Sequence, residues 1–93
     1  MNMEYYPLEQ GFAYGEEGKM PLARITLRKL NESTYAIDHT YVSPQLRGQG
    51  IAKKLVLLAA EKAREEGFTI APLCSYARKA MEEDPSLKDL IEP

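Results

Sequence analysis

The amino-acid sequence predicts an α+β fold: three antiparallel strands, a central helix, a fourth strand parallel to the third, and a short C-terminal helix. Apolar residues alternate in Met20–Leu30 and Thr34–Val42, on either side of a polar turn, which predicts a strand hairpin. From residue 51 onward an apolar face repeats at helical spacing and predicts the central helix. The apolar run Phe68–Leu73 follows and predicts the fourth strand, which a right-handed crossover makes parallel to the third.

The N-terminal half is expected to contain the three antiparallel strands. Gln10–Glu16 is predicted as a weak first strand, and Glu17–Lys19 as the turn that follows it. Met20–Leu30 is the second strand, Asn31–Ser33 the hairpin turn, and Thr34–Val42 the third strand. One side of the second strand carries three apolar residues that should share a face: Ala23, Ile25 and Leu27.

The central helix should begin at Gly50 or a neighbour and end at Gly67, which acts as a C-terminal cap. Its broad apolar face contains Ile51, Ala52, Leu55, Val56, Leu58, Ala59, Ala60 and Ala63. The opposite face contains Lys53, Lys54, Glu61, Arg64 and Glu65. Leu57 falls within this polar face, where it is either an ordinary surface leucine or a contact with a second subunit.

After the fourth strand the sequence predicts short helical structure. Pro72 should lie where the strand leaves the hydrogen-bonded ladder. Ser75 is the expected N-cap of a short helix that runs through Met81 and ends near Asp84-Pro85. One further helical turn before the terminus accounts for the last apolar residues: Leu87, Leu90 and Ile91.

Composition restricts the class of protein. A length of 93 residues fits one small domain over residues 1–93, and 44% hydrophobic with 28% charged residues is ordinary for a globular chain. The net charge of −2 argues against nucleic-acid binding, and no segment resembles a membrane span or a signal peptide. Cys74 is the single cysteine, so a disulfide framework or a Cys-rich metal site is not expected. These features predict a cytoplasmic monomer or weak dimer without a metal.

The segment Val42–Ala52 carries the most information about function. It places a glycine-rich loop before an apolar helix, and a helix N-terminus offers free N–H groups that suit a pyrophosphate. No acidic residue occurs from His39 to Ala60 or from Gly67 to Met81, although both windows contain Lys and Arg. Positive charge beside the glycine loop favours a polyanionic small ligand. The alternative is two solvated basic surfaces.

The order Gln-x-x-Gly-x-Gly over Gln45–Gly50, with Arg47 inside it, resembles the acyl-CoA-binding loop of the GNAT superfamily of N-acetyltransferases. The order of strand, loop, helix, strand and helix is similar to the central part of that fold over about Met20–Met81. The flanking segments His39–Val42 and Pro72–Ala77 resemble the very short stand-alone Yjdj-type subgroup. The resemblance implies a truncated GNAT-like acyl-CoA-binding domain that uses acetyl-CoA or coenzyme A.

Full-length GNAT enzymes carry an N-terminal strand with one or two helices and two further C-terminal strands, which this sequence is expected to lack. The resemblance therefore supports the acyl-CoA half of the site better than the amine half. The first hypothesis is an N-acetyltransferase that acts on an unknown amine, either a small molecule or a protein. The second is a non-catalytic CoA-binding or regulatory module, and the third is an interaction domain in which the glycine loop is only a turn.

By this resemblance, the loop supplies backbone N–H groups to the pyrophosphate from Arg47, Gly48, Gln49, Gly50, Ile51 and Ala52. Arg47, Lys53 and Lys54 are expected near the phosphates, although both lysines fit a solvated helix face equally well. Tyr41 and Val42 should border the pantetheine arm, which hydrogen-bonds the strand backbone as another strand would. The Tyr41 side chain is also compatible with the core.

Three residues are candidates for catalysis. Cys74 lies where the fourth strand meets a helix N-terminus, which can lower a thiol pKa, and a buried small residue is the alternative. His39 has the pKa range of a general base, and strand alternation places it opposite to Asp38, although a lone strand histidine is often structural. Tyr76 corresponds to the helix tyrosine that protonates the departing CoA thiolate in several GNAT enzymes, or else it packs on the main helix.

Overall fold

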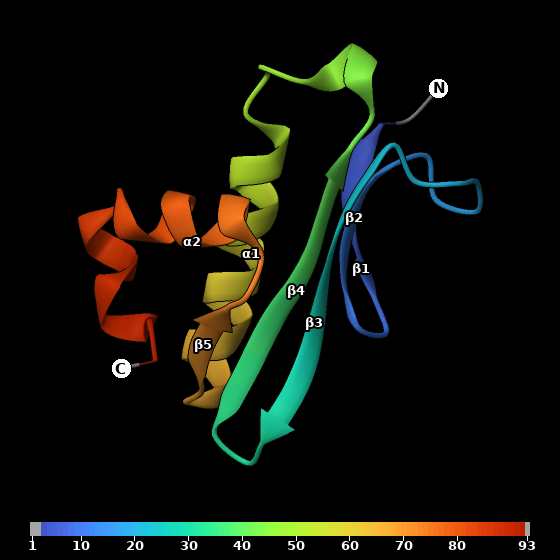
Figure 1. Cartoon of the computed structure of the whole chain (residues 1–93). Coiled ribbons are helices and arrows are strands. Elements are labelled where there is room, and N and C mark those ends of the chain that lie inside the picture. The colour runs from blue at the N-terminus through green and yellow to red at the C-terminus, as the bar shows by residue number, and fades with distance from the viewer. Residues whose placement is uncertain (1–2, 93) are drawn as a thin grey trace.

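The computed structural model describes residues 3–92 and contains one mixed sheet with its helices on a single side (Figure 1). The five strands lie in the order β1-β2-β3-β4-β5, and only the last pair is parallel. The strands are β1 Glu4–Leu8, β2 Gly11–Gly15, β3 Ala23–Asn31, β4 Thr34–Val42 and β5 Thr69–Pro72. The helices are η1 Pro44–Leu46, α1 Ile51–Glu66, α2 Ser75–Glu82 and η2 Pro85–Leu90. The predicted α+β class is confirmed, but the predicted number of strands is wrong.

The missing strand is β1, which forms a tight antiparallel hairpin with β2 and pairs Leu8 with Gly11. Pro7 interrupts the apolar alternation of this segment, and proline is tolerated because β1 is an edge strand. The hairpin is held by side chains as well, since the rings of Tyr5 and Tyr14 lie 4.7 Å apart. The chain therefore has an N-terminal strand that the sequence reasoning did not find.

The β3–β4 hairpin closes through a two-residue turn in which Asn31 pairs with Thr34. The Asn31 side chain accepts a hydrogen bond of 2.8 Å from the backbone N–H of Ser33, which fixes the turn locally. On β3 the predicted apolar face is confirmed, because Ala23, Ile25 and Leu27 are all buried.

Helix α1 covers the sheet and begins and ends at the predicted glycines, Gly50 and Gly67. Its buried residues match the predicted apolar face: Ile51, Leu55, Val56, Ala59, Ala60 and Ala63. Leu57 is half-buried and packs against the core, so its expected exposure is wrong. Helix α1 packs against α2 as well as against the sheet. A helix with two neighbours buries a wider part of its surface than one apolar face, which accounts for the partial burial of Leu57.

Strand β5 pairs in parallel with β4 from Thr34↔Thr69 to Ile37↔Pro72, which confirms the predicted crossover and the position of Pro72 at its end. The N-cap of α2 is Cys74 rather than Ser75, and Ser75 is the first helical residue. The expected final turn is the 3₁₀ helix η2, capped by Asp84, and it buries Leu87 and Leu90. Over residues 3–92, no helix has both the length and the apolarity needed to cross a bilayer.

Candidate functional site

Strands β4 and β5 separate after a short parallel contact. The backbone N–H groups of Leu73 and Cys74 both bond the carbonyl oxygen of Ile37, at 3.0 and 3.1 Å, and the chain then turns into α2. Within the described residues, β4 has no partner on this side from residue 38 to residue 42. The result is a stretch of free strand edge beside the glycine loop.

A cavity of about 420 Å³ lies at this free edge. Strand β4 contributes Thr40 and Val42, the loop contributes Leu46, Arg47, Gly48 and Gly50, α1 contributes Ile51 and Ala52, and α2 contributes Tyr76. Most of these residues are apolar or glycine, and the polar side chains among them are Thr40, Arg47 and Tyr76. No acidic residue is among the residues that line it.

The two glycines of the loop are needed for their backbone conformation. Gly48 and Gly50 have φ angles of 83° and 80°, in the left-handed region that other residues rarely adopt. A Cβ on either would meet no heavy atom within 4 Å, so the space beside each backbone is open. Immediately before Gly48, Arg47 donates a hydrogen bond of 3.3 Å from its Nε to the carbonyl oxygen of Val42, which ties the loop to the end of β4.

The start of α1 presents free donors to the cavity. The first helical hydrogen bond runs from the N–H of Lys54 to the oxygen of Gly50 at 3.1 Å, and no side chain caps this end. In residues 3–92, the N–H groups of Ile51, Ala52 and Lys53 have no acceptor. Together with the positive end of the helix dipole, these donors suit an anion.

Four basic side chains of the loop, α1 and α2 make no ion pair within the described part of the chain: Arg47, Lys53, Lys54 and Lys79. The hydrogen bonds from Ser86 lower the pKa of Asp84, and the positive charge of Lys53 lowers it further, which places Lys53 near the cap of η2. Lys53 is not among the described residues that line the cavity, and its expected contact with a phosphate stays a prediction.

Cys74 lies just behind the cavity wall. Its Sγ is 3.6 Å from the Oγ1 of Thr40, which does line the cavity. Burial raises the pKa of this thiol, but the backbone N–H of Ala77, the Thr40 hydroxyl and the N–H groups of Tyr76 and Thr40 together lower it. Although Cys74 is the N-cap residue of α2, its side chain makes no capping hydrogen bond to the first turn of that helix. The net pKa is below the ordinary thiol value, which favours a thiolate.

His39 lies on the face of the sheet away from this cavity. It pairs with Thr26, whereas Ile37 pairs with Leu27, so Asp38 is the extra residue of a β-bulge. Asp38 accepts a hydrogen bond of 2.7 Å from the Oγ1 of Thr26, so it shares the face of His39. The prediction that the two residues lie on opposite faces is wrong, because the bulge interrupts the alternation.

The carboxylate of Asp38 is already occupied by structural contacts. The hydrogen bond from Thr26 lowers its pKa, partial burial raises it, and Arg28 at 3.3 Å lowers it further, with a net decrease. Asp38 therefore stays ionised at neutral pH and holds β3 to β4. It is poorly suited to accept a proton.

Tyr76 lines the cavity from α2 and remains 42% exposed. Burial raises its pKa, and the charge of Glu83 at the C-terminal end of α2 raises it again. A tyrosine with a raised pKa keeps its proton at neutral pH and can donate it.

The structure thus brings together seven of the predicted residues around one cavity: Val42, Arg47, Gly48, Gly50, Ile51, Ala52 and Tyr76. Gln49 belongs to the same loop without lining the cavity, and Cys74 is one contact behind it. Tyr41 pairs with Arg24 on the opposite face, together with His39. Thr40 and Leu46 were not predicted. Thr40 was recognisable, because strand alternation puts it on the same face as Val42.

The donor set fits a polyanionic organic ligand rather than a metal ion. In residues 3–92, no three His, Cys, Asp or Glu side chains are grouped so that they could hold a metal. Coenzyme A combines a pyrophosphate with an extended amide-containing arm. Free N–H groups beside the glycines match the first, and the unpaired edge of β4 matches the second.

Comparison with known proteins agrees with this geometry. The family profile described as GCN5-related N-acetyl-transferase matches residues 11–90. A GCN5-like protein from Staphylococcus aureus, solved by NMR, superposes with a TM-score of 0.83 and 37% identity over 98% of this chain and 89% of that one. The uncharacterized N-acetyltransferase YjgM of Escherichia coli strain K12 is 53% identical over 32 residues, which are 34% of this chain and only 19% of that relative. The chain belongs to the family of GCN5-related N-acetyltransferases.

Proposed function

We propose that this chain binds acetyl-CoA in the cavity between β4, the glycine loop and α2, and transfers the acetyl group to an amine. The observation that carries the proposal is the meeting of free α1 N–H groups with the unpaired edge of β4 at one cavity. The segments His39–Val42 and Pro72–Ala77 further support the Yjdj-type subgroup. The whole described chain would then serve as a single acyl-CoA-binding domain.

The residues have distinct roles in holding the cosubstrate. The N–H groups of Ile51, Ala52 and Lys53, with the open space beside Gly48 and Gly50, would receive the pyrophosphate. Backbone groups of β4 beyond Ile37 would bond the pantetheine arm as a neighbouring strand does. When bound, acetyl-CoA supplies an activated thioester whose acyl carbon an amine can attack.

The protein groups nearest to the chemistry are Thr40, Cys74 and Tyr76. The backbone N–H of Thr40 helps to lower the pKa of the Cys74 thiol, which indicates that this N–H lies on the side of β4 that faces Cys74. A hydrogen-bond donor in this position can polarise a carbonyl group. The protonated Tyr76 hydroxyl is suited to neutralise a departing thiolate. Cys74 either lines the reacting group or becomes acylated itself, and intact mass after incubation with acetyl-CoA alone distinguishes these two routes.

A non-catalytic CoA-binding module is the second candidate function. The observation that favours it is the absence of a base among the residues that line the cavity, with His39 on the opposite face. A binding module needs the loop and the β4 edge but no proton acceptor for the amine.

The test measures binding and turnover separately. Calorimetric titration with CoA and acetyl-CoA should give saturable binding, and thiol release with a panel of small and peptide amines should exceed the rate without amine. Binding without turnover on any amine supports the second candidate. No binding of either ligand contradicts both, and leaves the loop as a structural turn.

A further inference from the structure

Coenzyme A carries two separate anionic groups, and the glycine loop accounts for one of them. The pyrophosphate suits the N–H groups at the start of α1. The second group is a phosphomonoester on the ribose, which carries a charge of about −2 at neutral pH. Such a dianion is recognised by Lys and Arg side chains, so a further cationic contact is needed at the cavity mouth.

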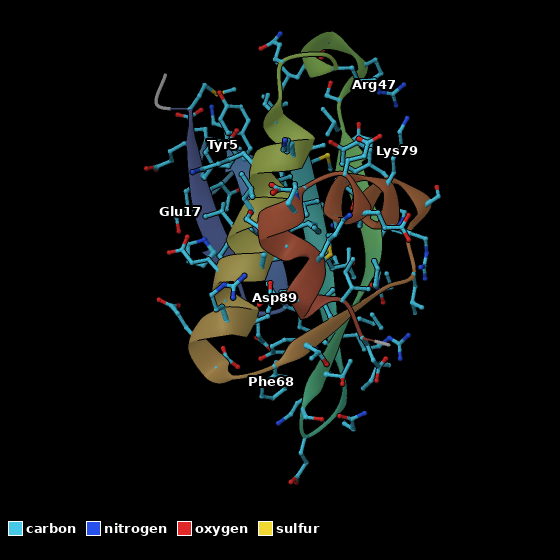
Figure 2. All side chains as sticks on the ribbon, turned by 90° about the vertical axis from the view of Figure 1, so that its left-hand side faces the viewer. Tyr5, Glu17, Arg47, Phe68, Lys79 and Asp89 are labelled. Carbon is cyan, nitrogen blue, oxygen red and sulfur yellow. The ribbon has the colours of Figure 1, made fainter. Side chains whose placement is uncertain are left out.

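Lys79 of α2 is in the right place for this contact. It follows Tyr76 by three residues, so the two side chains emerge from the same face of the helix, and Tyr76 lines the cavity. Figure 2 shows Lys79 directed to the same upper edge of the molecule as Arg47. Lys79 is exposed, and within residues 3–92 no ion pair engages it.

The other nearby cations are less suitable. Arg78 is adjacent in sequence but pairs with Glu82 at 3.7 Å. Lys53 lies close enough to Asp84 to lower the pKa of that carboxyl, so its charge is partly compensated. The charge of Glu83 acts on Tyr76, but no described ion pair joins Glu83 to Lys79.

We propose that Lys79, together with Arg47 across the cavity mouth, forms a site for the phosphomonoester of coenzyme A. This inference rests on the proposed function and extends it. The glycine loop binds the part of the ligand that CoA and dephospho-CoA share. Lys79 then allows the protein to distinguish CoA from dephospho-CoA, so that α2 contributes to ligand specificity as well as lining the cavity.

The experiment compares CoA with dephospho-CoA by calorimetry at low salt, using the wild-type protein, Lys79→Gln and the matched control Arg78→Gln. Wild-type protein should bind CoA about tenfold more tightly than dephospho-CoA, as expected for one charge-assisted contact. Lys79→Gln should lose about fivefold in CoA affinity and keep its dephospho-CoA affinity, because an exposed charge contributes modestly. Arg78→Gln should retain the wild-type preference. Thermal denaturation verifies that both variants are folded.

Three results overturn the inference while leaving the proposed function intact. In the first, Lys79→Gln weakens the binding of CoA and of dephospho-CoA equally, which assigns Lys79 to the shared pyrophosphate. In the second, Lys79→Gln changes the affinity for neither ligand. A preference that Arg78→Gln abolishes as strongly as Lys79→Gln also contradicts it, because the effect is then one of general helix charge. If wild-type protein binds neither ligand, the proposed function itself fails, and this inference fails with it.

Discussion

The two ends of α1 are built alike but use their polar groups differently. Both are flanked by glycine in the left-handed region, Gly50 with φ 80° and Gly67 with φ 74°. At the C-terminal end, the N–H of Gly67 is directed to the carbonyl oxygens of Ala63 and Arg64, and the N–H of Phe68 bonds Ala63 at 2.8 Å. At the N-terminal end, three N–H groups have no acceptor in the described residues.

Side-chain charges follow the same contrast. Near the C-terminal end Lys62 pairs with Glu66 at 2.8 Å and Arg64 with Asp89 at 3.0 Å. Near the other end, Arg47 and Lys54 make no ion pair within residues 3–92. An end whose donors and cations are already paired stabilises the fold, whereas an end that leaves them free can gain free energy from an anionic ligand. The contrast favours the N-terminal end of α1 as the ligand-binding end, without reference to sequence motifs.

The largest expected effect comes from replacing each of the two glycines that flank α1 with alanine. Gly50→Ala and Gly67→Ala should each cost about 1–2 kcal/mol of unfolding free energy, because alanine is strained at positive φ. Only Gly50→Ala should also lose CoA affinity, by about a hundredfold, if two charge-assisted hydrogen bonds worth about 3 kcal/mol are misaligned. Chemical denaturation and calorimetric titration measure the two quantities.

Gly67→Ala serves as the matched control, since a Cβ at either position meets no heavy atom within 4 Å. Equal losses of CoA affinity in the two variants would mean that the loop acts only through overall stability. Unchanged affinity in Gly50→Ala would remove the loop from the binding site.

Cys74 provides the second test, beside the binding end. Saturating acetyl-CoA should slow alkylation of this thiol about tenfold, as expected when about nine molecules in ten are occupied. Without ligand, the midpoint of the alkylation rate against pH should lie below the ordinary thiol pKa of 9.0, and Thr40→Val should raise it. Cys74→Ala should reduce any transferase activity and leave CoA binding intact. Slow labelling together with a destabilised Cys74→Ala protein would instead identify a packed structural residue.

Salt should act on the ligand rather than on the fold. The cations near the cavity are exposed, and the Debye length falls from about 10 Å at 0.1 M salt to about 3 Å at 1 M. Raising sodium chloride across this range should weaken CoA binding about fivefold, with a smaller effect on dephospho-CoA. A dissociation constant that does not depend on salt would exclude the basic side chains from binding.

The smallest effect concerns the C-terminal end and acid pH. The hydrogen bond from Lys62 lowers the pKa of Glu66, and that from Arg64 lowers the pKa of Asp89. Lowered carboxyl pKa values mean that their stabilisation is present at neutral pH and is lost as the pH falls below the ordinary values of 4.5 and 3.8. Asp89→Asn should flatten the fall in melting temperature between pH 5 and 3 without changing CoA affinity at pH 7. An unchanged profile would show that the pair is not coupled to folding.

The fold was predictable where a local rule determines it. Gly50 and Gly67 marked the ends of α1, and the alternation of Ala23, Ile25 and Leu27 gave the buried face of β3. Strand β1 was missed, because Pro7 disrupts its pattern and only pairing with β2 makes it a strand. The residues of one strand do not reveal its cross-strand partner, even when that partner follows directly in the sequence as β2 does.

The site was predictable for the loop and less so for its surroundings. The glycine motif singled out Gly48, Gly50 and Ala52, and all three line one cavity. The motif did not predict the bulge at Asp38, which depends on a register shift between Thr26 and Leu27 of the neighbouring strand. The bulge places Asp38 on the same face of the sheet as His39. The motif also could not show that Lys53 lies close enough to Asp84 to lower the pKa of that carboxyl, because this depends on where η2 packs.

The central claim is that the N-terminal end of α1 binds an anionic cosubstrate while the C-terminal end is structural. Two-dimensional ¹⁵N NMR during CoA titration tests it most directly, because every backbone N–H reports separately. The expected result is saturable shifts for the N–H groups of Gly48 to Lys53 and for the free edge of β4 between residues 38 and 42, with Lys62 to Phe68 unchanged. Shifts concentrated at the C-terminal end of α1, or no saturable shifts at all, would contradict the account.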